Sequence, residues 1–74
     1  MEQEIIKILK NINPYVEFDS DTDLIENEVI DSLGVLLLLT EIEKKYRIVI
    51  SMERLEPDNL RTVKRITNWV AGLI

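Results

Sequence analysis

Three stretches of this chain repeat apolar residues at helical spacing, and this pattern limits what so short a chain can fold into. The residues that share this spacing in 2–12, in 32–46 and in 62–73 are Ile5, Ile8, Leu9, Ile12; Val35, Leu38, Leu39, Ile42, Tyr46; and Val63, Ile66, Trp69, Val70, Leu73. Each stretch predicts an amphipathic helix that buries one face. A chain of 74 residues supplies only one core, so these faces are expected to meet in it.

The composition favours an all-α fold. Hydrophobic residues make up 46% of the chain, while two Gly and two Pro are few for a turn-rich sheet protein. Asn13-Pro14 is expected to end the first helix, and Thr62 to cap the last one.

The segment between the second and last helices is harder to interpret. Ile48-Val49-Ile50 is interpreted as a buried crossing, followed by a short turn that Ser51 caps and that runs to Leu55, and by a helical turn that Pro57 opens. We therefore expect a single domain, residues 1–74, built as a small four-helix bundle with a short third piece.

Absent residue types exclude most enzyme chemistry. The chain has no Cys and no His, so it lacks thiolate nucleophiles, imidazole bases and the usual zinc ligands. An enzyme would depend on a carboxylate pair such as Asp31 with a loop acid, and we expect no enzyme.

No stretch reaches the roughly 18 apolar residues of a membrane span, and the N-terminal segment is acidic where a secretory signal would be basic. We expect a cytoplasmic protein that neither inserts into membranes nor binds nucleic acid.

Residues 14–31 form an unusually long connection, which is more often functional than idle in a small domain. Its apolar residues are expected to hold it against the core: Tyr15, Val16, Phe18, Leu24, Ile25, Val29 and Ile30. Asp19, Asp21 and Asp23 alternate as calcium ligands can. The glycine and the distal Glu of an EF-hand loop are missing at their expected offsets, so no metal site is expected.

The second helix carries two unusual features. Leu33, Leu36 and Leu37 fall on the face opposite the predicted core stripe, where they either contact partners or pack under the long loop. Ser32 stands at the first helical position, where its hydroxyl is expected to cap free N–H groups. The same position also suits a covalently held anion, because a helix N-terminus presents unpaired N–H donors and partial positive charge.

These residues resemble the acyl and peptidyl carrier protein family, whose signature is Asp-Ser-Leu at the start of the second helix. The resemblance rests on Asp31-Ser32-Leu33, on the order of helix, acidic loop and amphipathic helix, and on the stretch from Pro57 to Val63 before the last helix. It implies that Ser32 carries 4′-phosphopantetheine, and that Asp31 assists the transferase, through its magnesium ion. It further implies that Leu33 contacts the arm, and that Leu36 and Leu37 belong to the face that partner enzymes bind.

The resemblance leaves the cargo open. The sequence differs from fatty acid synthase carriers at two places. Val29-Ile30 precedes Asp31, and Gly34, Leu37 and Lys44 stand where those carriers are expected to have acids. The motif is more similar to D-alanyl carrier proteins and to stand-alone carriers. The implied function is an acyl carrier with a thioester on the arm of Ser32. The alternatives are a D-alanyl or other aminoacyl carrier of a cell-wall or natural-product pathway, and an unmodified helical interaction module.

The implied partners are enzymes that modify, load or unload the carrier. They are a phosphopantetheinyl transferase, an acyl- or aminoacyl-loading enzyme, and a downstream acyltransferase or synthase. We expect the chain itself to be a monomer with no catalytic residues.

Overall fold

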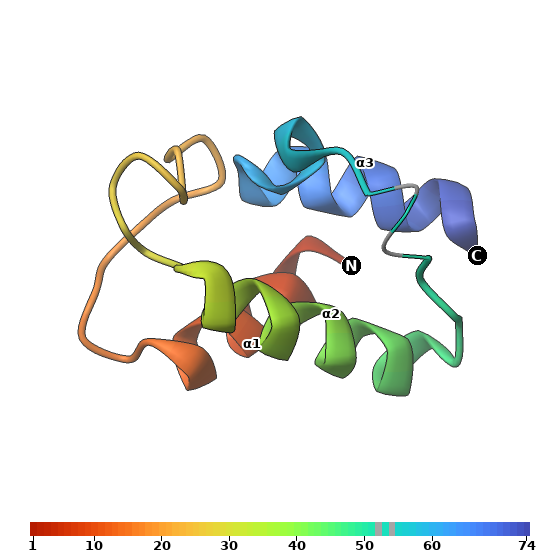
Figure 1. Ribbon diagram of the computed structural model, residues 1–74. Helices are drawn as coiled ribbons and strands as arrows, with labels where there is room; N and C mark the ends of the chain where they lie inside the picture. The colour runs from red at the N-terminus through yellow and green to blue at the C-terminus, as the bar shows by residue number, and fades with distance from the viewer. Residues whose placement is uncertain (52, 54) are drawn as a thin grey trace.

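Three α-helices and one 3-10 helix make up the regular structure of the described residues. The computed structural model describes residues 1–51, 53 and 55–74. Helix α1 spans Glu2–Ile12, α2 spans Ser32–Tyr46 and α3 spans Val63–Leu73, and the 3-10 helix η2 spans Pro57–Leu60 (Figure 1). Helix α1 packs against both α2 and α3, and η2 packs against α3.

The all-α prediction is confirmed, and so are the predicted extents of the helices. The expected four-helix bundle needs one correction: in the described residues the short piece is a 3-10 helix, so there are three α-helices rather than four. The turn expected from Ser51 to Leu55 includes residues 52 and 54, which lie outside the described residues.

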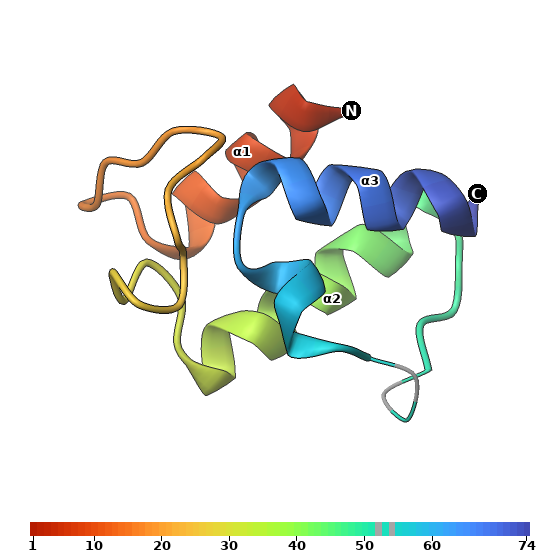
Figure 2. The same cartoon turned by 90° about the horizontal axis from the view of Figure 1, so that it is seen from above.

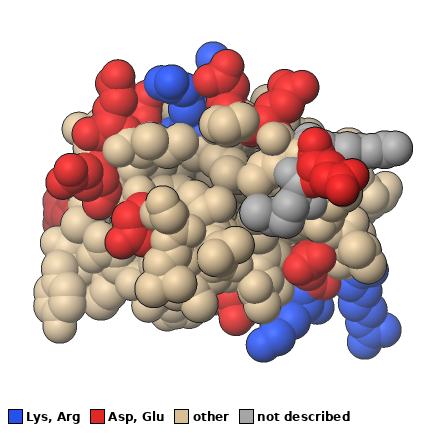
Figure 3. All heavy atoms as spheres, in the orientation of Figure 1, with Lys and Arg blue, Asp and Glu red and all other residues tan. Residues whose placement is uncertain are grey.

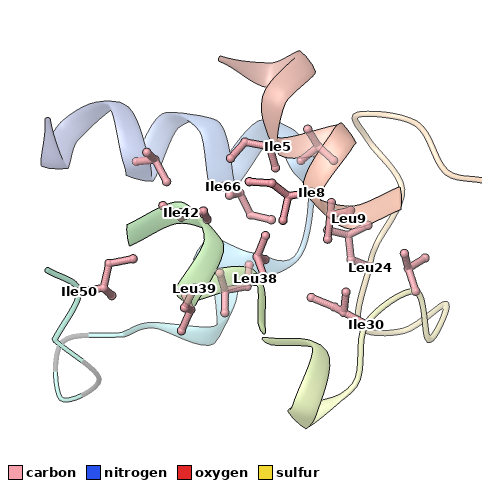
Figure 4. Close-up of a cluster of buried hydrophobic side chains, with 14 residues drawn as sticks. Ile5, Ile8, Leu9, Leu24, Ile30, Leu38, Leu39, Ile42, Ile50 and Ile66 are labelled. Carbon is pink, nitrogen blue, oxygen red and sulfur yellow. The ribbon is translucent and has the colours of Figure 1, made fainter. Parts of the chain in front are cut away.

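The core forms where the apolar faces of the helices meet (Figure 4). Ile5, Leu9, Leu38, Ile42 and Ile66 are completely buried in it. Val35, Tyr46 and Trp69 are only partly buried at its edge, and Leu73 is 43% exposed. Ile12 at the end of α1 is partly buried as well, so the predicted stripes identify the core except at positions towards the ends of the three helices.

The connection between α1 and α2 lies at the end of the molecule opposite the C-terminus (Figure 2). Leu24, Val29 and Ile30 hold it against the core, as expected. Asn13 at the end of α1 donates from Nδ2 to the carbonyl oxygen of Val29 at 3.2 Å. The expectation is wrong for Tyr15, which is 94% exposed, and for Ile25, which is 39% exposed.

The segment after α2 is only partly the buried crossing that we expected. Ile50 is buried, and its N–H donates to Glu43 Oε2 at 2.8 Å. Val49 is 91% exposed, because an extended chain turns alternate side chains to opposite sides and only one side faces the core. None of the helices in the described part of the chain is long and apolar enough to cross a membrane.

Candidate functional site

Ser32 is the first residue of α2 and its side chain is exposed. The residue that caps the helix is Asp31, whose Oδ1 accepts a hydrogen bond from the N–H of Gly34 at 2.7 Å. The expectation that the Ser32 hydroxyl caps α2 is therefore wrong, because Ser32 lies one residue too far into the helix. Among the described residues Ser32 Oγ has no hydrogen-bond partner, so its hydroxyl is free to react.

Gly34 lets this cap form at close range. A Cβ placed on Gly34 would lie 3.3 Å from Asp31 Oδ1 and 3.3 Å from Ile30 Cβ. Both distances are tighter than ordinary van der Waals contact. A larger residue would push the cap or the end of the loop away from α2, so Gly34 helps to place Ser32.

The Asp31 cap predicts a measurable effect on stability. We expect Asp31→Ala to lower the free energy of unfolding by about 0.5–2 kcal/mol, because one N–H of the first turn loses its acceptor. Thermal unfolding of Asp31→Ala and Asp31→Asn measures this effect. Asn caps a helix about as well as Asp, so the Asn variant should unfold like the parent, and equal losses in both variants would contradict the cap.

Glu28 lies three residues before the cap in a left-handed backbone conformation, with φ of 53°. This region is unfavourable for a residue with a Cβ and costs glycine nothing. We expect Glu28→Gly to raise the free energy of unfolding by up to about 1 kcal/mol, the greater freedom of Gly in the unfolded chain offsetting part of the gain. Urea unfolding of Glu28→Gly and of Glu28→Ala tests this. Ala has a Cβ and keeps the strain, so a higher free energy of unfolding in Glu28→Ala would refute the explanation.

Two open grooves meet at Ser32. The first, which we call the loop groove, has a volume of about 660 Å³ and is lined by Ile25, Glu28, Ile30, Asp31, Ser32 and Val35. The second, which we call the apolar groove, has a volume of about 390 Å³ and is lined by Ile25, Ser32, Val35, Leu36, Leu55, Pro57 and Leu60. A group attached to Ser32 Oγ therefore has space on both sides, one side bearing carboxylates and the other apolar.

Most of the apolar groove was not predicted from the sequence. Ile25 was expected to be a buried anchor, and Leu55, Pro57 and Leu60 had no predicted role beside Ser32. These residues come from the long loop and from the segment at η2, which are far apart in the chain. Their apolar character was the only signal, and it does not distinguish a groove wall from a core residue.

The leucines on the outer face of α2 are exposed, as the helical spacing predicted. Leu33 is 66% exposed, Leu36 51% and Leu37 48%. The alternative that the long loop covers them is therefore wrong. Uncharged side chains occupy much of the face that includes α2, and acidic side chains lie around it, on the side of the long loop and on the opposite side (Figure 3).

Two of the three alternating acids of the long loop, Asp19 and Asp23, accept hydrogen bonds within turns, whereas Asp21 pairs with Lys64. Asp19 Oδ1 accepts from the N–H of Asp21 at 2.9 Å and from Thr22 Oγ1 at 3.0 Å. Asp23 Oδ1 accepts from the N–H groups of Glu26 and Ile25. These hydrogen bonds stabilise the charged form and lower the pKa of both carboxyl groups. In the parts of the chain that are described, no group of three or more His, Cys, Asp or Glu is placed to hold a metal ion.

The site is suited to carrying an anion. The N–H groups of Ser32 and Leu33 open α2 and have no partners within the helix. They and the helix dipole would stabilise a phosphodiester on Ser32 Oγ. The exposed hydroxyl, the free N–H groups and the grooves on both sides all fit a phosphorylated arm.

Comparison with known proteins agrees with this geometry. A family model described as "Phosphopantetheine attachment site" matches residues 3–70. A search of curated proteins found no match. Domains of this type attach 4′-phosphopantetheine covalently. Because the match covers nearly the whole of the chain and the site fits the cofactor, the chain belongs to the family of phosphopantetheine attachment-site domains.

Proposed function

We propose that Ser32 Oγ forms the phosphodiester with 4′-phosphopantetheine and that the chain is an acyl carrier. The observation that carries this proposal is the exposed, unbonded hydroxyl at the N-terminus of α2, within a chain of the phosphopantetheine family. When bound, the arm supplies a thiol that holds the cargo as a thioester. The chain has no Cys of its own, so no side-chain thiol competes for the cargo.

Loading would require a partner enzyme. A transferase would direct the Ser32 hydroxyl at the phosphorus of coenzyme A next to the pantetheine. The new bond would join Ser32 Oγ to that phosphorus, the hydroxyl proton would pass to a base of the transferase, the pyrophosphate linkage would break, and adenosine 3′,5′-bisphosphate would leave. Asp31 Oδ1 is engaged in the cap, which leaves Oδ2 as the oxygen to meet the transferase and its magnesium ion.

The grooves favour an acyl cargo. The described residues that line the apolar groove beside Ser32 include no charged residue, so this lining suits an aliphatic chain and offers no carboxylate to pair with an ammonium group. The loop groove supports the second candidate, a D-alanyl or other aminoacyl cargo. Its lining includes the carboxylates of Glu28 and Asp31, which would attract an amino group.

The exposed leucines suit transient docking of partner enzymes. Leu33, Leu36 and Leu37 offer a small apolar patch beside the attachment point, and such patches often mark contact sites. A small patch favours release after each visit, as a carrier that meets a transferase, a loading enzyme and an acyltransferase or synthase in turn requires. In this role the chain is a cytoplasmic monomer that delivers cargo and catalyses no reaction itself.

The test is the intact mass of the chain after incubation with coenzyme A and a broad-specificity phosphopantetheinyl transferase. We expect a gain equal to one phosphopantetheine group, and no gain when the transferase is left out. A chain whose mass does not change would be the unmodified interaction module, and the carrier proposal would fail.

A further inference from the structure

Arg61 connects the long loop to η2. Its Nη1 lies 3.1 Å from Asp23 Oδ2 in the loop, and its Nε lies 2.9 Å from Asp58 Oδ1 in η2. Its carbonyl oxygen accepts a hydrogen bond from the N–H of Leu24 at 2.6 Å. Asp23 and Arg61 are 38 positions apart in the sequence. The bridge is therefore a long-range contact between the long loop and η2.

Leu24 connects Arg61 to the end of the loop that precedes Ser32 through backbone hydrogen bonds. This residue is completely buried, and its carbonyl oxygen accepts from the N–H groups of Val29 at 2.9 Å and Ile30 at 3.3 Å. Ile30 directly precedes the cap of α2. The contact of Leu24 with Arg61 therefore sets where the end of the loop, and with it the start of α2, lies relative to η2.

The same bridge joins the two elements that provide opposite walls of the apolar groove. Ile25 contributes the loop wall of this groove, and Pro57 and Leu60 contribute the wall at η2. Asp23 Oδ1 accepts from the N–H of Ile25 at 3.1 Å, so the carboxylate that Arg61 contacts also orients the loop wall. Arg61 therefore contacts both of the elements that bear the walls, through its side chain and through its carbonyl oxygen.

We propose that Arg61 is a positioning residue that holds the two walls of the apolar groove together and so shields an acyl chain carried on Ser32 from water. This inference rests on the proposed function, since it needs an acyl group on Ser32. Asp58 and Asp23 raise the pKa of Arg61, which agrees with a guanidinium that both carboxylates stabilise. Arg suits the bridge because its planar group contacts two carboxylates with separate N–H groups.

A second ion pair provides the matched control. Lys64 Nζ lies 3.5 Å from Asp21 Oδ1 and also links the loop to the region of η2 and α3. Its two side chains are 62% and 78% exposed, against 43% and 24% for Arg61 and Asp23. None of these four residues lines a groove at Ser32, but Asp23 accepts a hydrogen bond from the N–H of Ile25 in the loop wall. Removing the Lys64–Asp21 pair therefore changes the charge and attachment of the loop without affecting the carboxylate that orients this wall.

The experiment measures how fast a small nucleophile reaches the thioester. The parent chain, Arg61→Gln and Lys64→Gln are each loaded from octanoyl-coenzyme A and from acetyl-coenzyme A by the transferase, and loading is checked by mass. Hydroxylamine then cleaves the thioester, forming a hydroxamate and releasing the thiol of the arm. The acetyl group is too short to fill the groove, so it reports changes that do not involve shielding.

We expect octanoyl cleavage to be slower than acetyl cleavage in the parent chain. Arg61→Gln should speed octanoyl cleavage by about two- to fivefold, the range that a partly exposed ion pair supports, and leave acetyl cleavage unchanged. Lys64→Gln should change neither rate, and Arg61→Lys should restore part of the shielding. High salt should speed octanoyl cleavage in the parent and not in Arg61→Gln, since salt screens the bridge.

Other outcomes overturn the inference. Equal octanoyl rates in the parent and Arg61→Gln, or equal acceleration of both cargoes, would show that Arg61 does not shield the chain. If Arg61→Gln does not fold, Asp58→Asn removes one arm of the bridge at an exposed position and must show the same selective acceleration. A parent chain that gains no mass overturns the proposed function first, whereas a loaded chain without selective acceleration overturns only the role of Arg61.

Discussion

Ser32→Ala is expected to fold like the parent chain and to take up no phosphopantetheine. The loss of loading should be complete, because the substitution removes the oxygen that forms the phosphodiester. The fold should survive because the cap of α2 belongs to Asp31, and Ala is a better helix former than Ser. The melting temperature should therefore stay the same or rise slightly.

Intact mass and thermal unfolding of the same sample measure both effects. Ser51→Ala is the matched control, since Ser51 is also exposed but lies far along the chain from the start of α2. It should gain the full mass of the arm. A mass gain in Ser32→Ala would place the attachment on another residue, and an unfolded Ser32→Ala would show that the hydroxyl is needed for structure.

Leu38→Ala should destabilise the fold far more than Leu37→Ala, although the two leucines are neighbours in α2. Leu38 is completely buried, whereas Leu37 is 48% exposed. Removing the buried side chain leaves a cavity and should lower the free energy of unfolding by about 2–5 kcal/mol. Truncation of the exposed one should change it by no more than about 0.5 kcal/mol.

Urea unfolding of the two variants separates these expectations. The rate of loading adds a second readout, because Leu37→Ala should be loaded more slowly by the transferase if its side chain contacts that enzyme. Similar losses of stability in both variants would mean that the outer face of α2 is part of the core. A stable Leu37→Ala that loads at the parent rate would remove Leu37 from the docking face.

Local patterns in the sequence determined the helices. Apolar spacing predicted α1, α2 and α3, Asn13-Pro14 predicted the end of α1, and Thr62 predicted the start of α3, where its Oγ1 accepts from the N–H of Arg65. These signals are reliable because helix hydrogen bonds and caps join residues a few positions apart. The position of Ser32 at the start of α2 and the outward direction of the leucines follow from the same short-range geometry.

The structure alone decided which residue caps α2. Asp31 and Ser32 are adjacent and both have side chains that cap helices. The choice between them depends on the backbone conformation of each, and Asp31 is extended with φ of −108° and ψ of −171°. That conformation is imposed by the loop, which Leu24, Val29 and Ile30 fix against the core.

The amino-acid sequence alone was enough to predict an all-α member of the carrier protein family, with Ser32 at a helix start and leucines on the outer face of that helix. Packing was needed to show that Val49 and Ile25 face solvent, that an apolar groove lies beside Ser32, and that Arg61 pairs with both Asp23 and Asp58. These features differ from the helices in how far apart their residues lie along the chain. Helices are specified by neighbouring residues, whereas the groove and its bridge exist only after packing brings the long loop against η2.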